Sequence, residues 1–463
     1  MSRGKNIIRD VDWGLILIYL ILVSLGISTI YSAVSEPGHT FLFDMSKEYG
    51  KQSMWIGISL FLGFIILLLD GNFIIKNSYW AYAVTMLLLT LVLFTKPING
   101  ARSWFGFGSV GIQPSEFAKI GVSLALARYL SMKSVVIKKR KTNTNSTFTL
   151  ASTITSTIAA IQSNTPILII LGLPSMLVLL QPDAGTFIVF TSFILVLYRE
   201  GYAGNVLLFG IVSVFIAVIT LLAADNTFFI PFTKVMLSGK FGVFLVILFL
   251  GLLFYLAIKK LIQPRQRKSL YKALIGSMII SIIFINVVEL AYSNILQKHH
   301  RDRIDLVLGK IEDPNGKGYN INRAKAAIGS GGFAGKGYQQ AKLASANQRH
   351  VPEHSTDFIF CTWSEERGFI GSAGLVILFM VLLIKIVLIA ERQKSRFTRI
   401  YAYSVAGIFF YHFMINIGMA IGLAPVIGIP LPFFSYGGSG MMSFSILLFI
   451  LIKLDAERKS ILQ

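Results

Sequence analysis

Long apolar runs alternate with short polar segments along almost the whole chain. Most runs hold about 17 to 25 residues, which is long enough for a helix to cross roughly 30 Å of hydrocarbon. The pattern therefore predicts membrane-spanning helices joined by polar connections. We predict twelve spans, at residues 14–34, 53–70, 78–95, 116–131, 165–181, 184–198, 204–223, 240–258, 273–292, 366–390, 399–421 and 440–455.

The composition agrees with this pattern. Of the 463 residues, 54% are hydrophobic and only 14% are charged, and the mean hydropathy is +0.68. These values exclude an ordinary soluble globular protein. We expect an all-α, polytopic membrane helix bundle that forms one multi-span domain over residues 1–463. The single cysteine, Cys361, excludes disulfides within the chain and argues against a cysteine-based zinc site.

The basic residues predict the orientation of the chain, because Lys and Arg collect in cytoplasmic loops. They cluster in the N-terminal segment and near 138–141, 259–272, 392–399 and 453–459, which are all cytoplasmic if the N-terminus is inside. Both termini are then cytoplasmic, and residues 296–365 face outward. The net charge of +21 needs no nucleic acid, since anionic membrane lipids are the simpler partner.

Two connections are too long to be simple turns. Residues 132–164 predict a cytoplasmic linker loop, either mobile or loosely helical, because their Ser/Thr-rich part offers little that packs. Residues 296–365 predict one large extracytoplasmic loop, the only sizeable water-exposed region that we expect. Chemistry is therefore most expected in this outward loop.

Asp357 lies in the polar run His350–Phe360, where the outward loop meets renewed apolar sequence. An ionisable group at a membrane surface is costly to keep without a role. We therefore take Asp357 as the candidate catalytic residue. The structural alternative is an N-cap at the start of the next span.

The outward loop also contains the glycine-rich segment Gly329–Gly337. Its spacing does not fit a nucleotide-binding Walker loop, because Lys336 is followed by Gly337 and not by Ser or Thr. Two interpretations stay open. The segment is a plain turn, or it is a loop whose backbone N–H groups approach a phosphate.

Three further polar segments interrupt the spans. Glu116 and Lys119 lie three residues apart and so share a helix face, either as an ion pair inside the bundle or, with Arg102, as the lining of a polar cavity. Asp183 in an outward turn is a cap residue or a site residue. The prolines between 425 and 432 forbid a continuous helix there, which predicts a re-entrant or outward loop.

These segments carry an ordered set of motifs. They read Asn-Gly-Ala-Arg-Ser-Trp with Gln-Pro-Ser-Glu-Phe-Ala-Lys, then Gln-Pro-Asp-Ala-Gly-Thr, then Pro-Glu-His-Ser-Thr-Asp-Phe-Ile-Phe, then Gly-Leu-Ala-Pro-Val-Ile-Gly-Ile-Pro-Leu-Pro-Phe-Phe-Ser-Tyr-Gly-Gly-Ser. Together they resemble the SEDS family of bacterial shape, elongation, division and sporulation proteins. The proline-rich motif is similar to the elongation branch, whereas the division branch typically carries a Thr-Lys-Gly version.

The resemblance implies a peptidoglycan glycosyltransferase that polymerises lipid II into glycan strands during cell elongation and rod-shape maintenance. It places this enzyme in the bacterial cytoplasmic membrane, with the active site on the outer face. The implied partners are a class B penicillin-binding protein, which is a transpeptidase, and other elongation-complex proteins. Carried over by motif, Asp357 falls on the family's essential acidic position, and Arg102, Glu116, Lys119 and Asp183 fall on its polar motif positions.

The chemistry can also be argued from the residues. In an inverting transfer, a carboxylate takes the proton of the acceptor 4-hydroxyl as that oxygen attacks the anomeric carbon. Undecaprenyl pyrophosphate leaves without protonation if cations hold its charge. We expect Arg102, Lys119 and Lys336 to be candidates for that task. The sequence specifies no cofactor and leaves a divalent cation, Mg or Mn, open.

The chain departs from the family pattern at residues 204–272, where an extra apolar pair with a basic hairpin adds to a family core of about ten spans.

Three rival hypotheses for the function remain. A lipid II flippase would use intramembrane charges such as Glu289 and Lys385, but the chain has no convincing internal repeat. The others are a division polymerase of the same family and a scaffold that only recruits a transpeptidase.

Overall fold

The structure is a computed structural model of the chain. It describes residues 10–35, 44–96, 102–107, 110–133, 150–201, 227–229, 236–261, 263–295, 301, 317–341, 343 and 354–458, with scattered positions in 213–221. For residues 150–164 it describes the backbone alone. The chain divides into two compact units, Met1–Glu200 with Asn320–Gln463, and Gly201–Tyr319.

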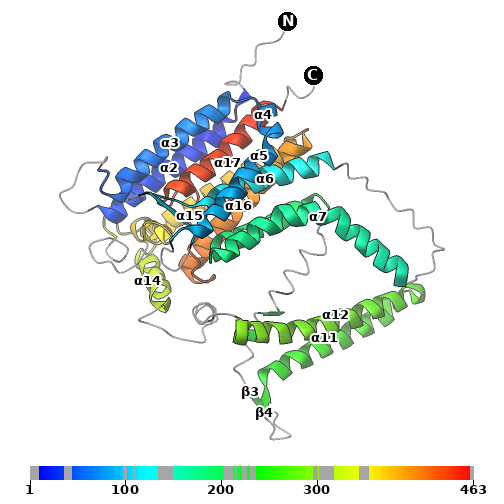
Figure 1. The fold of residues 1–463 in the computed structure, drawn as a ribbon. Helices are drawn as coiled ribbons and strands as arrows, with labels where there is room; N and C mark the ends of the chain where they lie inside the picture. Colours follow the sequence, from blue (N-terminus) through cyan, green and yellow to red (C-terminus); the bar gives the residue numbers. More distant parts are fainter. Residues whose placement is uncertain are drawn as a thin grey trace. The chain divides into compact units, whose positions relative to one another are not determined.

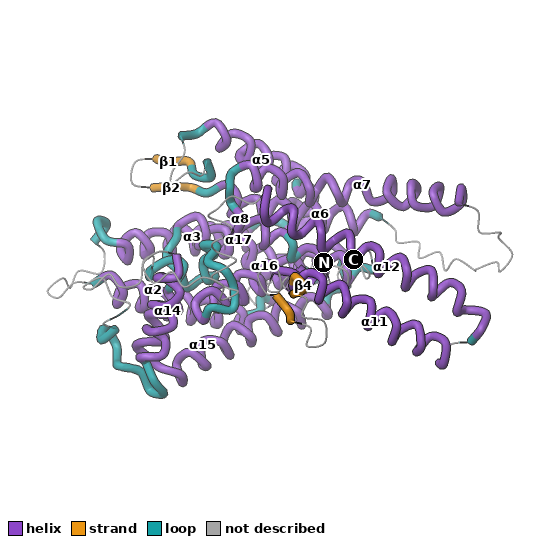
Figure 2. Tube along the Cα trace, turned by 90° about the horizontal axis from the view of Figure 1, so that it is seen from below, coloured by secondary structure: helices purple, strands orange, loops and turns teal. Residues whose placement is uncertain are grey.

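The first unit is a bundle of long helices (Figure 1). Its helices are α2 (Trp13–Val34), α3 (Glu48–Leu68), α4 (Gly71–Lys76), α5 (Ser78–Leu91) with the 3-10 turn η1 (Val92–Phe94), α6 (Pro114–Met132), α7 (Leu150–Leu180), α8 (Ala184–Phe190), α9 (Phe193–Arg199), α14 (Lys317–Ser330), α15 (Ile359–Arg392), α16 (Arg396–Ile421) and α17 (Gly438–Ala456). A short antiparallel hairpin, β1 (Phe105–Phe107) and β2 (Val110–Ile112), precedes α6 (Figure 2).

The helix ends follow the local sequence. Asp12 caps α2 by accepting a hydrogen bond from the backbone N–H of Leu15 at 3.1 Å. Pro114 occupies the first turn of α6, where its missing N–H costs nothing. At the other end of α16, Gly422 takes the left-handed conformation (φ 79°) that closes a helix. These signals position the polar segments that connect the helices.

The predicted fold class is confirmed. Every predicted span except 204–223 coincides with a helix, and most of 204–223 lies outside the described residues. In the part of the chain that the structure describes, seven helices are long and apolar enough to cross a membrane, and three shorter apolar helices accompany them.

The second half of the predicted linker is helical, which is one of the two states expected for it. The backbone of 150–164 is helical and runs without a break into the span that we expected to begin at 165. No Gly or Pro interrupts residues 150–165, and the helix then continues through Pro166 and Pro174. The first half of the predicted linker, from residue 134, lies outside the described residues.

The centre of the first unit is α17. In its most apolar 18-residue stretch, 94% of the residues are buried inside the protein, against 28% for α3, so α17 is surrounded by protein whereas α3 is only partly covered. It packs against α3, α6 and α16. In a membrane the exposed apolar faces of the outer helices contact lipid, and the buried helices hold the polar residues discussed below.

The second unit contains a helical hairpin that matches two of the predicted spans. Helix α11 (Gly239–Leu261) and helix α12 (Pro264–Leu290) lie side by side, and α12 continues into the π-helical turn η2 (Ala291–Ile295) (Figures 1 and 2). Lys240 near one end of the hairpin forms an ion pair with Glu289. A short antiparallel pair, β3 (Thr227–Phe229) and β4 (Met236–Ser238), precedes α11.

An ion-pair network joins three helix ends of the first unit. Asp12 accepts hydrogen bonds from Lys385 at 2.8 Å and from Arg392 at 3.1 Å, and Arg392 also pairs with the buried Asp455. Burial opposes the ionisation of Asp12. The bonds from Lys385, Leu15 and Arg392 outweigh it, so that the pKa of Asp12 lies below its ordinary value of 3.8.

We predict a pH-dependent stability difference between the wild type and Asp12→Asn. Because the pKa of Asp12 is lowered by folding, its stabilisation is complete above the unfolded value and is lost as the pH falls below about 3.8. The variant should be less stable by roughly 1 kcal/mol or less near neutral pH, since the pair is partly exposed. Thermal unfolding at several pH values measures this, and a difference that stays constant down to about pH 3 would contradict it.

Candidate active site

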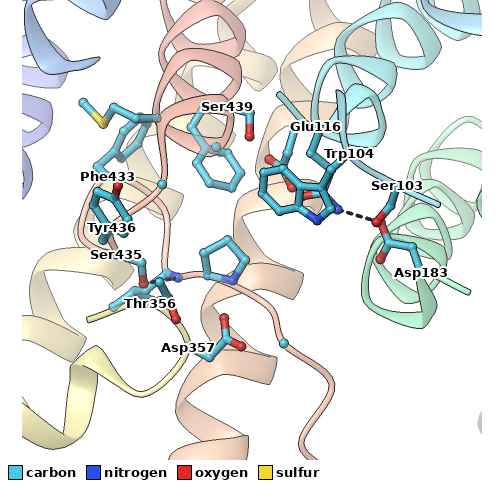
Figure 3. Close-up of a pocket in the computed structure, with 18 of the residues that line it drawn as sticks. Ser103, Trp104, Glu116, Asp183, Thr356, Asp357, Phe433, Ser435, Tyr436 and Ser439 are labelled. Carbon is cyan, nitrogen blue, oxygen red and sulfur yellow. Dashed lines mark hydrogen bonds between the residues drawn. The ribbon is translucent and has the colours of Figure 1, made fainter. Parts of the chain in front are cut away.

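A cavity of about 320 Å³ lies in the first unit, where several polar connections meet (Figure 3). It is lined by Ser103, Trp104, Gln113 and Glu116 from the segment around β1, β2 and α6, by Pro182 and Asp183 before α8, by Thr356 and Asp357 before α15, and by residues of 428–444. Three of the predicted site residues, Glu116, Asp183 and Asp357, therefore share one cavity although they are far apart in the sequence.

Asp357 lies in the turn that precedes α15, and its carboxylate lines the cavity (Figure 3). The N-cap position of α15 is Phe358, which directly follows Asp357. The backbone carbonyl of Asp357 accepts a hydrogen bond from the amide of Asn416 at 2.9 Å. A Cβ atom built on Gly428 would lie 3.2 Å from Oδ2 of Asp357, so the carboxylate rests against the backbone of the proline-rich loop.

Glu116 and Lys119 form the predicted ion pair inside the bundle. Lys119 Nζ donates to Oε2 of Glu116 at 2.8 Å, and the two side chains are 0% and 5% exposed. Glu116 lines the cavity, whereas Lys119 lies behind it, 2.9 Å from Nε2 of His412 and 4.6 Å from the centre of the Phe444 ring. The ammonium is thus held by protein groups, and it is not among the described lining residues.

Asp183 caps a helix, as predicted, and its side chain also lines the cavity. Its Oδ1 caps α8 by accepting from the backbone N–H of Thr186 at 3.0 Å. Its Oδ2 accepts from Gln113 and Ser115, each at 2.9 Å, and from the Thr186 hydroxyl. Asp183 therefore fixes the start of α6 to the start of α8, and the same carboxylate lines the cavity.

The proline-rich segment between α16 and α17 is not helical, as predicted. Gly428 (φ 76°) and Phe433 (φ 64°) have left-handed backbones that fold it back on itself. The backbone N–H of Leu431 donates to the Ser435 hydroxyl at 2.8 Å, and the amide of Gln52 on α3 donates to the Ser435 carbonyl at 3.4 Å. This loop supplies one wall of the cavity.

None of the three predicted phosphate-binding residues is among the described residues that line the cavity, and Lys119 lies behind it as described above. Lys336 Nζ pairs with the buried carboxylate of Glu365 at 2.6 Å, so its charge is used to hold the segment after α14 on α15. Arg102 donates to the carbonyl of Leu93 at 3.4 Å and is the residue before Ser103 and Trp104, which do line the cavity. The sequence shows that each residue is charged, but it does not show which group the side chain contacts.

The glycine-rich segment is a tight structural turn, the first of its two interpretations. The backbone N–H groups of Lys336 and Gly337 donate to the carbonyls of Glu365 and Glu366 at 3.1 and 3.0 Å. They are therefore used within the protein and do not point at a ligand. Gly335 has φ 86°, and a Cβ atom there would lie 2.1 Å from the carbonyl oxygen of Glu366.

We predict that Gly335→Ala destabilises the protein by at least about 2 kcal/mol, because it combines a left-handed backbone with a backbone clash. Gly329→Ala is the matched control, since a Cβ atom at Gly329 meets nothing within 4 Å and Gly329 lies in α14. Thermal unfolding of the two purified variants makes the comparison. Equal melting temperatures for Gly335→Ala and the wild type would contradict the packing described above.

The charge of the cavity is negative. Its described lining includes the three carboxylates Glu116, Asp183 and Asp357 but contains neither Lys nor Arg. Burial and the charge of Glu48 raise the pKa of the lining Tyr436, so this phenol stays neutral at physiological pH. Within the described ranges, no three His, Cys, Asp or Glu side chains gather closely enough to hold a metal ion by themselves.

Sequence reasoning missed two site residues, His412 and Asn416. Both are buried polar residues in an otherwise apolar span, four positions apart. This spacing puts them on one helix face and was the only signal available. Trp104 and Tyr436 belonged to motifs that we noted, but their place in the cavity wall appears only in the structure (Figure 3).

The family model described as "Cell cycle protein", which covers FtsW, RodA and SpoVE, matches residues 12–236 and 270–460 of the chain. The chain belongs to the SEDS family. The match leaves out residues 237–269, which contain α11 of the second unit.

Several SEDS proteins are similar along almost the whole chain. The peptidoglycan glycosyltransferase RodA of Treponema pallidum is 30% identical over 97% of this chain and 99% of its own length. The peptidoglycan glycosyltransferase MrdB of Escherichia coli is 28% identical over 82% of this chain and 79% of its own length. The stage V sporulation protein E of Bacillus subtilis is 29% identical over 93% of both.

Solved structures agree with the fold. A chain in the structure of a peptidoglycan synthase complex that coordinates polymerization and crosslinking aligns with a TM-score of 0.59 and 25% identity, over 97% of this chain and 98% of that one. The rod shape determining protein RodA of Thermus thermophilus aligns with a TM-score of 0.50 and 21% identity, over 97% of both chains. The polytopic SEDS fold therefore extends over the chain.

Proposed function

We propose that this SEDS protein is a peptidoglycan glycosyltransferase that polymerises lipid II during cell elongation. The observation that carries the proposal is the cavity itself. It brings Asp357 together with two further carboxylates and a wall of polar loop residues. Similarity to the RodA and MrdB glycosyltransferases over most of the chain supports the reaction class.

Asp357 acts as the general base in this proposal. Its carboxylate takes the proton of the acceptor 4-hydroxyl while that oxygen forms the new bond to the anomeric carbon of the donor. The bond from this carbon to the pyrophosphate oxygen breaks, and undecaprenyl pyrophosphate leaves with the bonding electrons. The anomeric centre inverts. A second catalytic acid is unnecessary, because a pyrophosphate is a far better leaving group than the alkoxide that glycosidases must protonate.

The leaving group requires positive charge, which the described cavity lining does not contain. Arg102 is the nearest candidate in the sequence, because it directly precedes the lining residues Ser103 and Trp104. A divalent cation, Mg or Mn, would supply the remaining charge. Such ions are commonly held by one or two carboxylates plus phosphate oxygens, so Glu116 with the substrate would hold one, whereas both oxygens of Asp183 already accept hydrogen bonds.

The setting of the reaction follows from the same proposal. Lipid II reaches the cavity from the outer leaflet, and both termini lie in the cytoplasm. A class B penicillin-binding protein crosslinks the strands, in keeping with the synthase complex that aligns with this chain. The elongation role rests on the Pro-Val-Ile-Gly-Ile-Pro-Leu-Pro motif. Depletion of the protein should give round cells, whereas filaments would indicate the division role.

The direct test is the release of the leaving group. Purified protein in detergent with lipid II and Mg or Mn should release one undecaprenyl pyrophosphate for each disaccharide added to a strand. A lipid II flippase would move lipid II between leaflets of a vesicle without releasing any. Absence of release, even with a transpeptidase that lacks glycosyltransferase activity, would overturn the proposal.

A further inference from the structure

Two buried polar residues of α16, His412 and Asn416, lie directly behind the wall of the cavity. They are 2% and 0% exposed and are one helical turn apart on the same face. Neither lines the cavity, yet both contact the backbone segments that form it. Their role must therefore be sought in what they hold in place.

Asn416 joins the segment of Asp357 to the proline-rich loop. Its amide nitrogen donates to the carbonyl of Asp357 at 2.9 Å and to the carbonyl of Ile429 at 2.7 Å, which uses both amide protons. Its Oδ1 is buried and has no hydrogen-bond partner among the described residues. Burying such an atom costs free energy. The residue therefore contributes through its two donated bonds rather than through packing.

His412 joins the same loop to α6. Its Nδ1 lies 3.0 Å from the carbonyl of Pro430. A carbonyl only accepts, so Nδ1 carries a proton and donates it. Nε2 then offers a lone pair to the ammonium of Lys119 at 2.9 Å, and Lys119 also donates to Glu116 at 2.8 Å. The imidazole thus connects the loop to the ion pair whose carboxylate lines the cavity.

The two side chains hold consecutive carbonyls, those of Ile429 and Pro430, which directly follow Gly428. Gly428 lies against the Asp357 carboxylate, where even an added Cβ atom would come within 3.2 Å of Oδ2. A small shift of this loop would therefore displace the carboxylate or crowd it. The position of Asp357 depends on how α16 holds the loop.

We propose that Asn416 and His412 are positioning residues that set where the Asp357 carboxylate stands in the cavity. The inference rests on the proposed function, because it concerns the geometry of a general base. Both residues act through Asp357 and touch no substrate. Their loss should slow turnover while substrate binding is kept.

The main test compares Asn416→Ala and Asn416→Asp with the wild type in lipid II polymerisation. Asp has nearly the shape of Asn but carries no N–H group and, when protonated, donates at most one bond, so it loses at least one of the two donated bonds without leaving a hole. Both variants should lower kcat by about 10-fold to 100-fold. A displacement of the reacting groups by about 1 Å can lower the rate by up to about 100-fold. The KM for lipid II should stay within about threefold of the wild type, because the cavity lining is unchanged.

Tyr401→Phe is the matched control for stability. Tyr401 is also buried on α16, and its hydroxyl donates to the carbonyl of Leu447 at 3.1 Å, so the change removes a buried bond of the same kind. It lies 11 positions before His412, which places it roughly 16 Å away along the helix. The melting temperature of Tyr401→Phe should fall below that of the wild type, as it should for the Asn416 variants, but its kcat should equal the wild-type value.

A pair of His412 variants tests which contact matters. His412→Asn keeps a donor near the Nδ1 position, facing Pro430, whereas His412→Gln keeps an acceptor near the Nε2 position, facing Lys119. If the loop contact positions Asp357, the Asn variant should retain at least about fivefold more kcat than the Gln variant. The reverse order would assign His412 to the ion pair and overturn its part of the proposal.

The outcomes separate this inference from the proposed function. An active wild type, an inactive Asp357→Ala variant and Asn416 variants with wild-type kcat would overturn the inference alone. An Asp357→Ala variant with wild-type kcat would overturn the assignment of Asp357 as the general base, whatever kcat the Asn416 variants have. A wild-type KM with reduced kcat in Asn416→Asp, and unchanged kcat in Tyr401→Phe, is the result that supports the positioning role.

Discussion

Lys119→Met is expected to destabilise the protein by roughly 3–5 kcal/mol, because it leaves the buried carboxylate of Glu116 without its counter-charge. Lys119 is fully buried and Glu116 is 5% exposed, so water does not compensate for the lost partner. His412 also loses the donor to its Nε2. Thermal unfolding of the purified variant in detergent measures the effect.

The double variant Lys119→Met/Glu116→Gln is the control for this prediction. It removes both charges and keeps side chains of similar size, so much of the lost stability should return. The recovery would show that the unpaired charge, and not a packing defect, destabilises the single variant. A single variant as stable as the wild type would contradict the buried ion pair.

Asp357→Asn is expected to lower kcat for lipid II polymerisation by about 10²-fold to 10⁴-fold, which is the range for loss of a general base. Asn has almost the same shape and keeps the backbone carbonyl that Asn416 holds. The cavity should therefore still bind substrate, and the KM should change little. Steady-state rates with purified lipid II give both values.

Glu391→Gln is the control for the removal of a carboxylate. Glu391 lies at the opposite end of α15, is 49% exposed and pairs with Arg199. The Glu391→Gln variant should keep the wild-type kcat.

Asp357→Glu should retain only part of the activity, because Gly428 leaves little room for a longer side chain. An Asp357→Asn variant within about threefold of the wild type would exclude Asp357 as the base.

The sequence alone predicted those features of the structure that depend on a single helix or a single turn. The apolar runs located the spans because the thickness of a bilayer fixes their length. The spacing of Glu116 and Lys119 gave their ion pair, since residues three apart on a helix face one another. Asp183 proved to be a cap residue, which short-range turn chemistry also predicts.

The sequence was insufficient wherever a residue's partner lies far along the chain. Lys336 was expected at a phosphate, but its partner Glu365 lies 29 residues away on α15. His412 and Asn416 gave no clear signal, because their acceptors belong to loops that only the folded bundle brings to α16. The Ser/Thr composition of 150–164 left both a mobile and a loosely helical linker open, and its backbone continues α7.

The central claim is that this SEDS protein itself joins lipid-linked disaccharides at the cavity that contains Asp357. Incubation of the purified protein with radiolabelled lipid II, followed by electrophoresis of the products, tests it most directly. The wild type should give a ladder of glycan strands, and Asp357→Asn should give at least about 100-fold less product in the same time while still binding lipid II. Equal ladders from both proteins, or no ladder from a folded wild type with its transpeptidase partner, would contradict the account.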